Sequence, residues 1–326
     1  MDSLLKSALK IDTVEFVRTV EGGLVNKAAI YHAGGRNVFV KTNDVSHARQ
    51  LFESEEESLK TIAATSVVRT PTTFGVYDNL DDGSASLLME CLPDLKPISS
   101  SDGWTRLGEI VARIHLHNKQ LLQASSTAHV ERSHQNKPLN AGKDAPVLQP
   151  QKNFGYHVPS FFGSHFRIEP TWKKSWQEYF TENLLNPIYQ QILEKFACTE
   201  LQEQWSILLQ HMDYFFKNIT ITPSILIGDL AAINLGETEG EIVIFDPCCL
   251  YGFSEFDLTQ ALAFDEFQEP FYEAYFKLIP KQERFEERLM LHKLFAYLLC
   301  WTYEIEGMEQ LAKTELRKIT NMLTSV

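Results

Sequence analysis

The chain has little basic charge, few cysteines and no long apolar run. Its 326 residues include 30 lysines and arginines against 43 aspartates and glutamates, a formal charge of −13. Because nucleic-acid binding needs a basic surface that neutralises phosphates, this balance argues against a general nucleic-acid-binding protein. The sequence contains no run of about 18 apolar residues, so we also expect no membrane partner.

The five cysteines are dispersed and form no Cys-x-x-Cys pair. An odd, dispersed set is typical of reduced thiols in a cytosolic protein. The first residues show no sustained apolar segment and no small-residue cleavage pattern of a secretory signal. We therefore expect a cytoplasmic protein with free thiols at Cys91, Cys198, Cys248, Cys249 and Cys300.

The character of the sequence changes near residue 93. Before this point, β-prone runs alternate with glycine-containing turns, and one helical pattern lies at 48–63, where Asp44 or Ser46 is expected to cap the helix. After it, most segments have helical spacing. This pattern predicts an α+β fold, with an N-terminal antiparallel sheet lobe (1–92) and a larger helical lobe (93–326). Ligands favour the cleft between two such lobes.

Two segments of the second lobe carry further expectations. Residues 124–152 are polar and lack a clear period, which predicts a long loop. Residues 170–217 have helical spacing, and Trp172 and Trp176 are expected to anchor them in the core. The alternative for these tryptophans is a minor role in binding a substrate.

The helical pattern after Lys41 places one carboxylate on its apolar face. At 100° per residue, Glu55 lies near the centre of the stripe that Leu51, Phe52 and Leu59 form. A lone carboxylate on an apolar face is costly unless it is paired, and Lys41 ends the preceding strand. Such a Lys–Glu pair holds nucleotide phosphates in the small lobe of protein kinases. The alternative is that Glu55 lies at the rim of the lobe and is solvated.

A Gly-Gly pair, Gly22-Gly23, lies between two predicted strands. Glycines let backbone N–H groups approach phosphates closely, so these two residues are candidates for nucleotide binding. Taken alone, Gly-Gly is also typical of a plain hairpin turn.

Three polar residues follow apolar strands in the second lobe. Asp229 and Asn234 are five residues apart, and Asp246 follows the run Ile-Val-Ile-Phe. The kinase catalytic loop has this Asp-to-Asn spacing and a later metal-binding Asp. Mg²⁺ prefers oxygen ligands, which Asn234 and Asp246 supply, and Asp229 can accept a proton from an attacking hydroxyl.

Over nearly its whole length the chain resembles the fructosamine/ketosamine-3-kinase family, which is related to protein kinases and aminoglycoside phosphotransferases. The segments that carry the resemblance are NVFVKTN, ARQLFESEEESL, VRTPTTFGVYD, LLMECL, NFGYHVPSFFG and FDPCCLYGFSEFDL. The resemblance implies a protein-kinase-like bilobal fold and phosphorylation of the 3-hydroxyl of ketosamines, including those on glycated proteins, with ATP and Mg²⁺. The product is unstable, so the reaction implies deglycation repair.

The resemblance also implies a set of site residues. They are Asp229 as catalytic base, Asn234 and Asp246 as Mg²⁺ ligands, Lys41 with Glu55 at the ATP phosphates, and the backbone of the hinge residues Glu90, Cys91 and Leu92 around adenine.

The chain departs from the family in the loop that carries the base. The family usually reads His-Gly-Asp-Leu-Trp-Ser-Gly-Asn, and this chain reads Ile-Gly-Asp-Leu-Ala-Ala-Ile-Asn from Ile227 to Asn234. The family's Trp, which can stack on a sugar face, is Ala231 here. Its later His is Phe253, which is a candidate to supply an aromatic ring from another direction.

Three interpretations follow from these departures. The first is a ketosamine kinase, because the base and the metal-binding positions are retained. The second is a kinase for another amino-sugar or amino-alcohol, which the changed Ala231, Ala232 and Ile233 favour. The third is a pseudokinase that binds nucleotide without turnover. His115 and His117, in helical sequence with no metal-like spacing, are expected to be structural or solvated.

Overall fold

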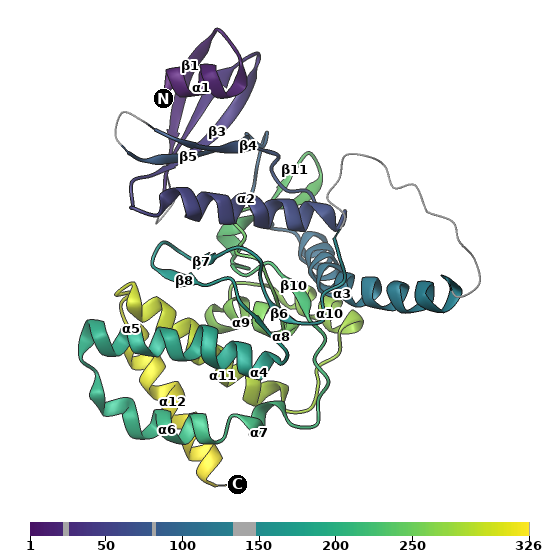
Figure 1. Ribbon diagram of the computed structural model, residues 1–326, viewed down its shortest axis with the longest axis vertical. Coiled ribbons are helices and arrows are strands. Elements are labelled where there is room, and N and C mark those ends of the chain that lie inside the picture. Colours follow the sequence, from purple (N-terminus) through teal and green to yellow (C-terminus); the bar gives the residue numbers. More distant parts are fainter. Residues whose placement is uncertain (22–25, 80–82, 133–147, 326) are drawn as a thin grey trace.

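The computed structural model describes residues 1–21, 26–79, 83–132 and 148–325. Figure 1 shows a sheet-containing part that carries the N-terminus and a larger, mainly helical part that carries the C-terminus. The predicted α+β, kinase-like bilobal fold is therefore confirmed. The division of the chain at residue 92 stays a prediction.

The N-terminal part is a five-stranded antiparallel sheet in the order β1-β2-β3-β5-β4. Its elements are α1 (Asp2–Leu9), β1 (Val14–Val20), β2 (Lys27–Ala33), β3 (Arg36–Asn43), α2 (Ala48–Ala64), β4 (Thr73–Asp78) and β5 (Ala85–Glu90). Side chains alternate across the sheet, so Val38, Val40 and Leu88 pack with Leu5 of α1. The other face packs Leu87 and Met89 of β5 with α2.

The C-terminal part surrounds a four-stranded sheet in the order β10-β13-β6-β9, with two separate hairpins. Its strands are β6 (Phe154–Gly155), β7 (Ser160–Phe162), β8 (Phe166–Ile168), β9 (Trp172–Lys173), β10 (Ser224–Leu226), β11 (Leu235–Thr238), β12 (Glu241–Ile244) and β13 (Leu250–Gly252). The helices are α3 (Ser101–Arg132), α4 (Trp176–Tyr179), η1 (Phe180–Leu185), α5 (Asn186–Phe196), η2 (Thr199–Leu201), α6 (Gln202–Gln210), α7 (Asp213–Phe216), η3 (Ala232–Asn234), α8 (Ser254–Asp257), α9 (Thr259–Phe264), α10 (Glu269–Leu278), α11 (Phe285–Thr302) and α12 (Met308–Thr324).

The predicted cap of α2 is wrong. The N-cap position is His47, and its side chain makes no capping hydrogen bond. The turn before the helix is closed by Asn43 instead, whose Oδ1 accepts from the backbone N–H of Val45 at 2.9 Å. Asp44 pairs with Lys27 at 3.2 Å, so its carboxylate is directed elsewhere.

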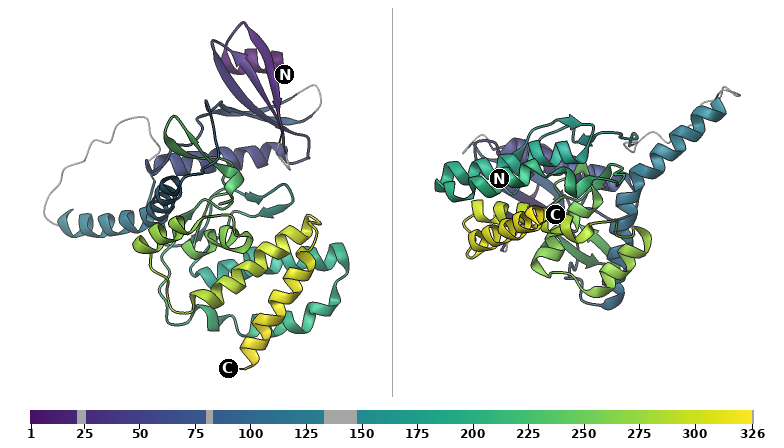
Figure 2. Two further views of the ribbon diagram at one scale, coloured as in Figure 1. Left: turned by 180° about the vertical axis from the view of Figure 1, so that it is seen from behind. Right: turned by 90° about the horizontal axis from the view of Figure 1, so that it is seen from below.

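The predicted loop at 124–152 is wrong at its start, because α3 continues to Arg132. The hydroxyls of Ser125, Ser126 and Thr127 donate to carbonyls three or four residues earlier, so they accommodate the helix. Figure 2 shows the end of α3 extending away from the body, which explains why this segment has no apolar period. Residues 133–147 of the predicted loop lie outside the described residues.

The two tryptophans predicted to anchor the core differ in their burial. Trp176 is 1% exposed and packs at the centre of an aromatic cluster with Phe180 and Phe256. Trp172 lies in β9, before the helical segment begins, and is 38% exposed, so its assignment to the core is wrong.

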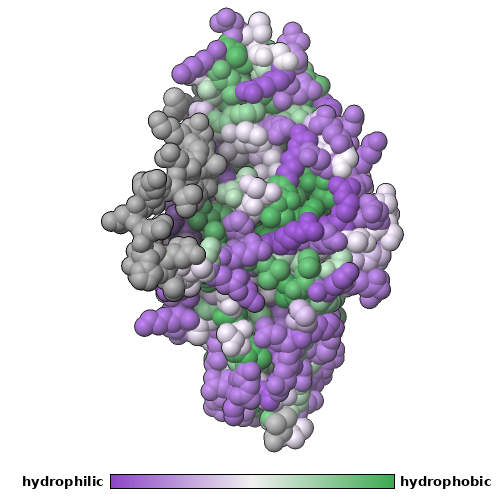
Figure 3. Space-filling model, turned by 90° about the vertical axis from the view of Figure 1, so that its right-hand side faces the viewer, coloured by the Kyte–Doolittle hydropathy of each residue, from purple (hydrophilic) through white to green (hydrophobic). Residues whose placement is uncertain are grey.

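The surface is mainly polar. Figure 3 shows a face on which hydrophilic residues predominate and hydrophobic residues gather in patches near the middle. Within the described chain, no helix has both the length and the apolar character needed to cross a bilayer.

Candidate active site

Lys41 is the cation at the meeting point of the two lobes. Its Nζ lies 2.7 Å from Oε1 of Glu55 and also contacts Oδ1 of Asp246. The pair between β3 and α2 predicted from the sequence is therefore present. Because the Lys41 side chain is 7% exposed and that of Glu55 is 11% exposed, the alternative of a solvated Glu55 is wrong.

The sheet alternation explains this geometry. Val38 and Val40 face α1, so Lys41 projects from the opposite face, toward α2. Burial alone would lower the pKa of Lys41, but the charges of Asp246 and Glu55 raise it above its ordinary value. Burial raises the pKa of Glu55, and Lys41 opposes that shift. Lys41 therefore stays protonated beside two carboxylates.

Asp229 and Asn234 form one hydrogen-bonded unit. Nδ2 of Asn234 donates to Oδ2 of Asp229 at 2.8 Å and to its carbonyl oxygen at 3.0 Å. The amide oxygen of Asn234 is thereby left for another partner. Burial raises the pKa of Asp229, hydrogen bonds from Asn234 and Gln260 lower it, and the charges of Asp246 and Glu266 add to the increase.

A buried carboxylate fixes the backbone in front of Asp229. Asp257 is 3% exposed and accepts from the backbone N–H groups of Ile227 at 2.8 Å and Gly228 at 2.7 Å. It also lies 3.0 Å from Nε2 of His115, whose Nδ1 contacts the Tyr275 hydroxyl at 2.7 Å. His115 is therefore structural, as predicted. The role of Asp257 was not predicted, because only the tertiary fold brings it to the loop.

Gly228 allows the loop to pass close to the segment after Asp246. Its φ is 90°, and a Cβ at this position would overlap the carbonyl oxygen of Cys248. The backbone N–H of Cys248 donates to the carbonyl of Ile227 at 2.8 Å. These contacts hold Asp229 and Asp246 on neighbouring stretches of backbone.

The substituted loop positions have distinct environments. Ile227 is fully buried in the core and Ala231 is 3% exposed, whereas Ile233 is 66% exposed. The backbone N–H of Ala232 donates to Oε2 of Glu266 at 2.7 Å. The α9–α10 connection therefore supports the loop, which the local sequence pattern does not indicate.

The expectation that Phe253 supplies an aromatic ring to the acceptor is wrong. Phe253 is 2% exposed, and its ring lies against the Arg288 guanidinium and the His292 ring in the core. Arg288 is held there by Glu255, with nitrogen–oxygen distances of 2.7 and 2.9 Å.

The donor set around Lys41 fits a magnesium–nucleotide complex better than an all-protein metal site. Within the described ranges, no group of three or more His, Cys, Asp or Glu side chains is arranged to hold a metal ion. Mg²⁺ commonly uses one or two protein oxygens together with phosphate oxygens. Asp246, whose side chain is 38% exposed, and the amide oxygen of Asn234 supply this kind of donor.

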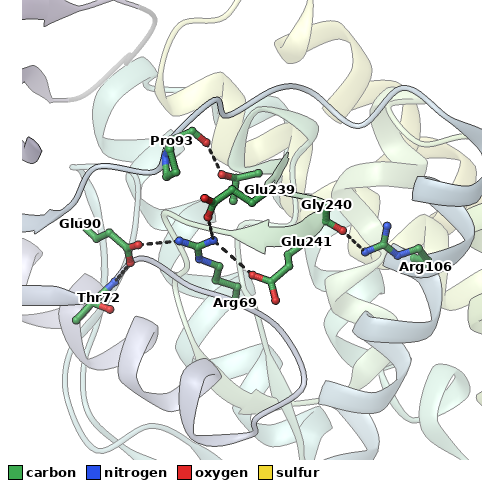
Figure 4. A network of polar contacts seen from close by, with 9 residues as sticks. Arg69, Thr72, Glu90, Pro93, Arg106, Glu239, Gly240 and Glu241 are labelled. Atoms are coloured by element: carbon green, nitrogen blue, oxygen red, sulfur yellow. Dashed lines mark hydrogen bonds and ion pairs between the residues drawn. The ribbon is translucent and has the colours of Figure 1, made fainter.

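The hinge strand is held by Arg69. Arg69 lies 2.8 Å from Oε1 of Glu90, and its other Nη atom lies 3.1 Å from Glu239 and 3.4 Å from Glu241 of the β11–β12 hairpin (Figure 4). The backbone N–H of Glu90 donates to the Thr72 carbonyl at 2.8 Å. The backbone N–H of Glu90 is therefore already paired within the protein.

The remaining predicted site residues have less structural definition. Cys91 and Leu92 follow β5 and are partly exposed. Gly22 and Gly23 lie outside the described residues.

The sequence is similar to those of known kinases over most of its length. The family model for fructosamine kinase matches residues 2–127 and 120–323. The mouse protein named ketosamine-3-kinase is 33% identical over 307 residues, which cover 93% of this chain and 94% of the mouse protein. The chloroplastic protein-ribulosamine 3-kinase of Arabidopsis thaliana is 29% identical over 290 residues, covering 89% of this chain and 78% of that protein.

Solved structures show the same fold. A Haemophilus somnus protein assigned as a fructosamine-3-kinase superposes with a TM-score of 0.74 at 21% identity, covering 98% of this chain and 96% of that one. An aminoglycoside phosphotransferase structure gives 0.60 at 10% identity, with 99% of each chain covered. The chain thus belongs to the fructosamine kinase family, whose members are phosphotransferases that act on a hydroxyl group.

Proposed function

We propose that this chain is an ATP-dependent kinase that phosphorylates the 3-hydroxyl of ketosamines, including fructosamines and ribulosamines on glycated proteins. The observation that carries the proposal is the grouping of Lys41, Glu55 and Asp246 next to the bonded pair Asp229–Asn234. Relatives named ketosamine-3-kinase and protein-ribulosamine 3-kinase support the acceptor. The fold is also that of a phosphotransferase crystallised with AMP-PNP and hygromycin B.

Each residue has a defined task in this proposal. Asp229 orients the attacking hydroxyl and accepts its proton, and its raised pKa makes it a better base than an exposed carboxylate. Asn234 holds Asp229 in place through Nδ2. Lys41, fixed by Glu55, binds phosphate oxygens. The backbone at Glu90, Cys91 and Leu92 binds adenine, and Gly22 and Gly23 take part in nucleotide binding.

Asp246 and the amide oxygen of Asn234 would hold Mg²⁺ together with the nucleotide phosphates. When bound, the ion neutralises negative charge on the phosphates during transfer. Before nucleotide binds, Lys41 compensates the charge of Asp246.

The biological role in this proposal is the repair of glycated proteins. A phosphate on O3 is a leaving group next to carbon 2 of the ketosamine, so its elimination destabilises the sugar–amine adduct. We place this activity in the cytoplasm, and the five cysteines, which are all free, are compatible with a reducing compartment.

The test is ADP release by the purified chain with Mg-ATP and a panel of fructosamines, ribulosamines, amino-sugars and amino-alcohols. Asp229→Asn serves as the blank. Turnover on ketosamines that is lost in the blank would support the proposal. Turnover only on other acceptors would replace the acceptor class, and Mg-ATP binding without turnover on any acceptor would indicate a pseudokinase.

A further inference from the structure

Glu266 is a carboxylate attached to the loop that carries Asp229. It lies in the connection between α9 and α10, and its Oε2 accepts from the backbone N–H of Ala232 at 2.7 Å. Its own backbone N–H donates to the carbonyl of Ala261 at 3.1 Å, which fixes the connection. Ala232, the residue that Glu266 contacts, lies one turn of backbone after Asp229. A hydrogen bond of 2.9 Å from the Ala231 N–H to the Asp229 carbonyl closes this turn.

The charge of Glu266 is not balanced by a side chain of the described ranges. Within those ranges the Glu266 carboxylate accepts one hydrogen bond, from a neutral backbone N–H, and forms no ion pair. Lys41, the cation at the site, is already shared between Glu55 and Asp246. Two carboxylates near each other repel and cost free energy unless a cation compensates them. The charges of the two carboxylates therefore favour a positively charged ligand.

The charges of Asp229 and Glu266 both reach the thiol of Cys300, near the end of α11. Burial raises the pKa of its thiol to about 11, and the charges of Asp229 and Glu266 contribute to the increase.

The chemistry of the acceptor supplies the cation. In a ketosamine only C1 and C2 separate the amine nitrogen from the carbon that carries the 3-hydroxyl. A protein group that binds the amine must therefore lie beside Asp229, the proposed base. The aliphatic amine is protonated at neutral pH, so a carboxylate with a free oxygen is its natural partner.

We infer that Glu266 binds the ammonium group of the acceptor and thereby selects amine-linked sugars over neutral ones. This inference rests on the proposed function, because it assigns a specificity residue to the same site. Glu266 recognises charge, whereas Asp229 carries the proton transfer.

The experiment separates the charge of Glu266 from its support of the loop. In Glu266→Gln the amide oxygen still accepts from the Ala232 N–H, but the negative charge is lost. Glu266→Ala loses both. Glu273→Gln, an exposed position on α10, is the matched control for removal of an acidic charge nearby. Each variant is compared with wild type by thermal midpoint and by Mg-ATP affinity.

Two acceptors are used: a ketosamine with a protonated amine and its N-acylated analogue, which is neutral at the same nitrogen. Acceptor binding is measured by calorimetry on the protein saturated with Mg-AMP-PNP, and KM and kcat are measured with Mg-ATP. We expect Glu266→Gln to weaken binding of the charged ketosamine about 10- to 100-fold, the usual size of a charge-assisted hydrogen bond. Binding of the acylated analogue and Mg-ATP affinity should change less than about twofold.

Equal losses for both acceptors, or no loss for the charged one, would overturn the inference. If wild type binds the charged ketosamine in a Glu266-dependent way but does not turn it over, the inference stands and the proposed function fails. If wild type turns over ketosamines and Glu266→Gln does so with the same KM and the same acceptor affinity, the proposed function stands and the inference fails. If wild type neither binds nor phosphorylates ketosamines, both are wrong.

Discussion

The replacement Asp257→Asn tests how the loop that carries Asp229 is held. The Asp257 carboxylate accepts from Gly228 through Oδ1, and from Ile227 and His115 through Oδ2. An amide has one acceptor oxygen, so an N–H₂ group must replace one carboxylate oxygen. The amide oxygen can keep the two bonds at the Oδ2 position. The N–H₂ group then faces the N–H of Gly228, and both groups are donors.

The magnitude follows from these contacts. Loss of a hydrogen bond to a charged acceptor costs about 1.5–3 kcal/mol, and a buried unsatisfied N–H costs about 1–3 kcal/mol. We expect the free energy of unfolding to fall by about 2.5–6 kcal/mol, the sum of the two costs. With an unfolding entropy of about 0.7 kcal/mol/K for a chain of this length, the midpoint should fall by about 4–9 °C. Turnover should also fall, because Gly228 precedes Asp229, whereas Mg-ATP affinity should stay close to wild type.

The assay combines a thermal unfolding scan with steady-state kinetics. Asp102→Asn, at an exposed position in the first turn of α3, is the matched control and should shift the midpoint by less than about 1 °C. A variant Asp257→Asn with the wild-type midpoint and wild-type turnover would show that this carboxylate does not hold the loop.

Two further predictions concern the core behind the site. Arg288→Met should lower the free energy of unfolding, measured in urea, by about 3–5 kcal/mol, because it leaves Glu255 buried without its cation. Adding Glu255→Leu to that variant should restore most of the loss. An Arg288→Met variant as stable as wild type would contradict this. His292 is fully buried, and burial together with the Arg288 charge lowers its pKa to about 3. Below about pH 6.5 the His292 imidazole takes up a proton in the unfolded chain but stays neutral in the folded state. The free energy of unfolding therefore falls as the pH is lowered from about 6.5 toward 3. Between pH 7 and 4.5 wild type should lose about 2.5 kcal/mol relative to His292→Leu, and parallel stability–pH curves would refute the assignment.

Local periodicity was sufficient to predict the Lys41–Glu55 pair. A strand alternates with a period of two and a helix winds at 100° per residue, so each pattern alone states which face its charged residue occupies. The two faces then have to meet in any fold that packs α2 on the sheet. The Asp229–Asn234 bond is equally local, since five residues separate the two side chains.

Longer-range contacts explain what the sequence did not show. Asp257 reaches the catalytic loop from α8, and Glu266 reaches it from the α9–α10 connection, so neither is marked by local spacing. Phe253 was placed at the acceptor by position in a motif alone, although its side chain points into the core. The end of α3 lacked an apolar period because it does not pack on the body.

The most direct test of the account is the structure of the product. Wild type and Asp229→Asn would be incubated with Mg-ATP and a fructosamine, and the position of any phosphoryl group would be read by phosphorus–proton correlation in nuclear magnetic resonance. The account predicts a ketosamine 3-phosphate from wild type and none from Asp229→Asn, with Mg-ATP affinity retained in both. Phosphorylation at another hydroxyl, equal product from Asp229→Asn, or Mg-ATP binding with no phosphorylated ketosamine would contradict it.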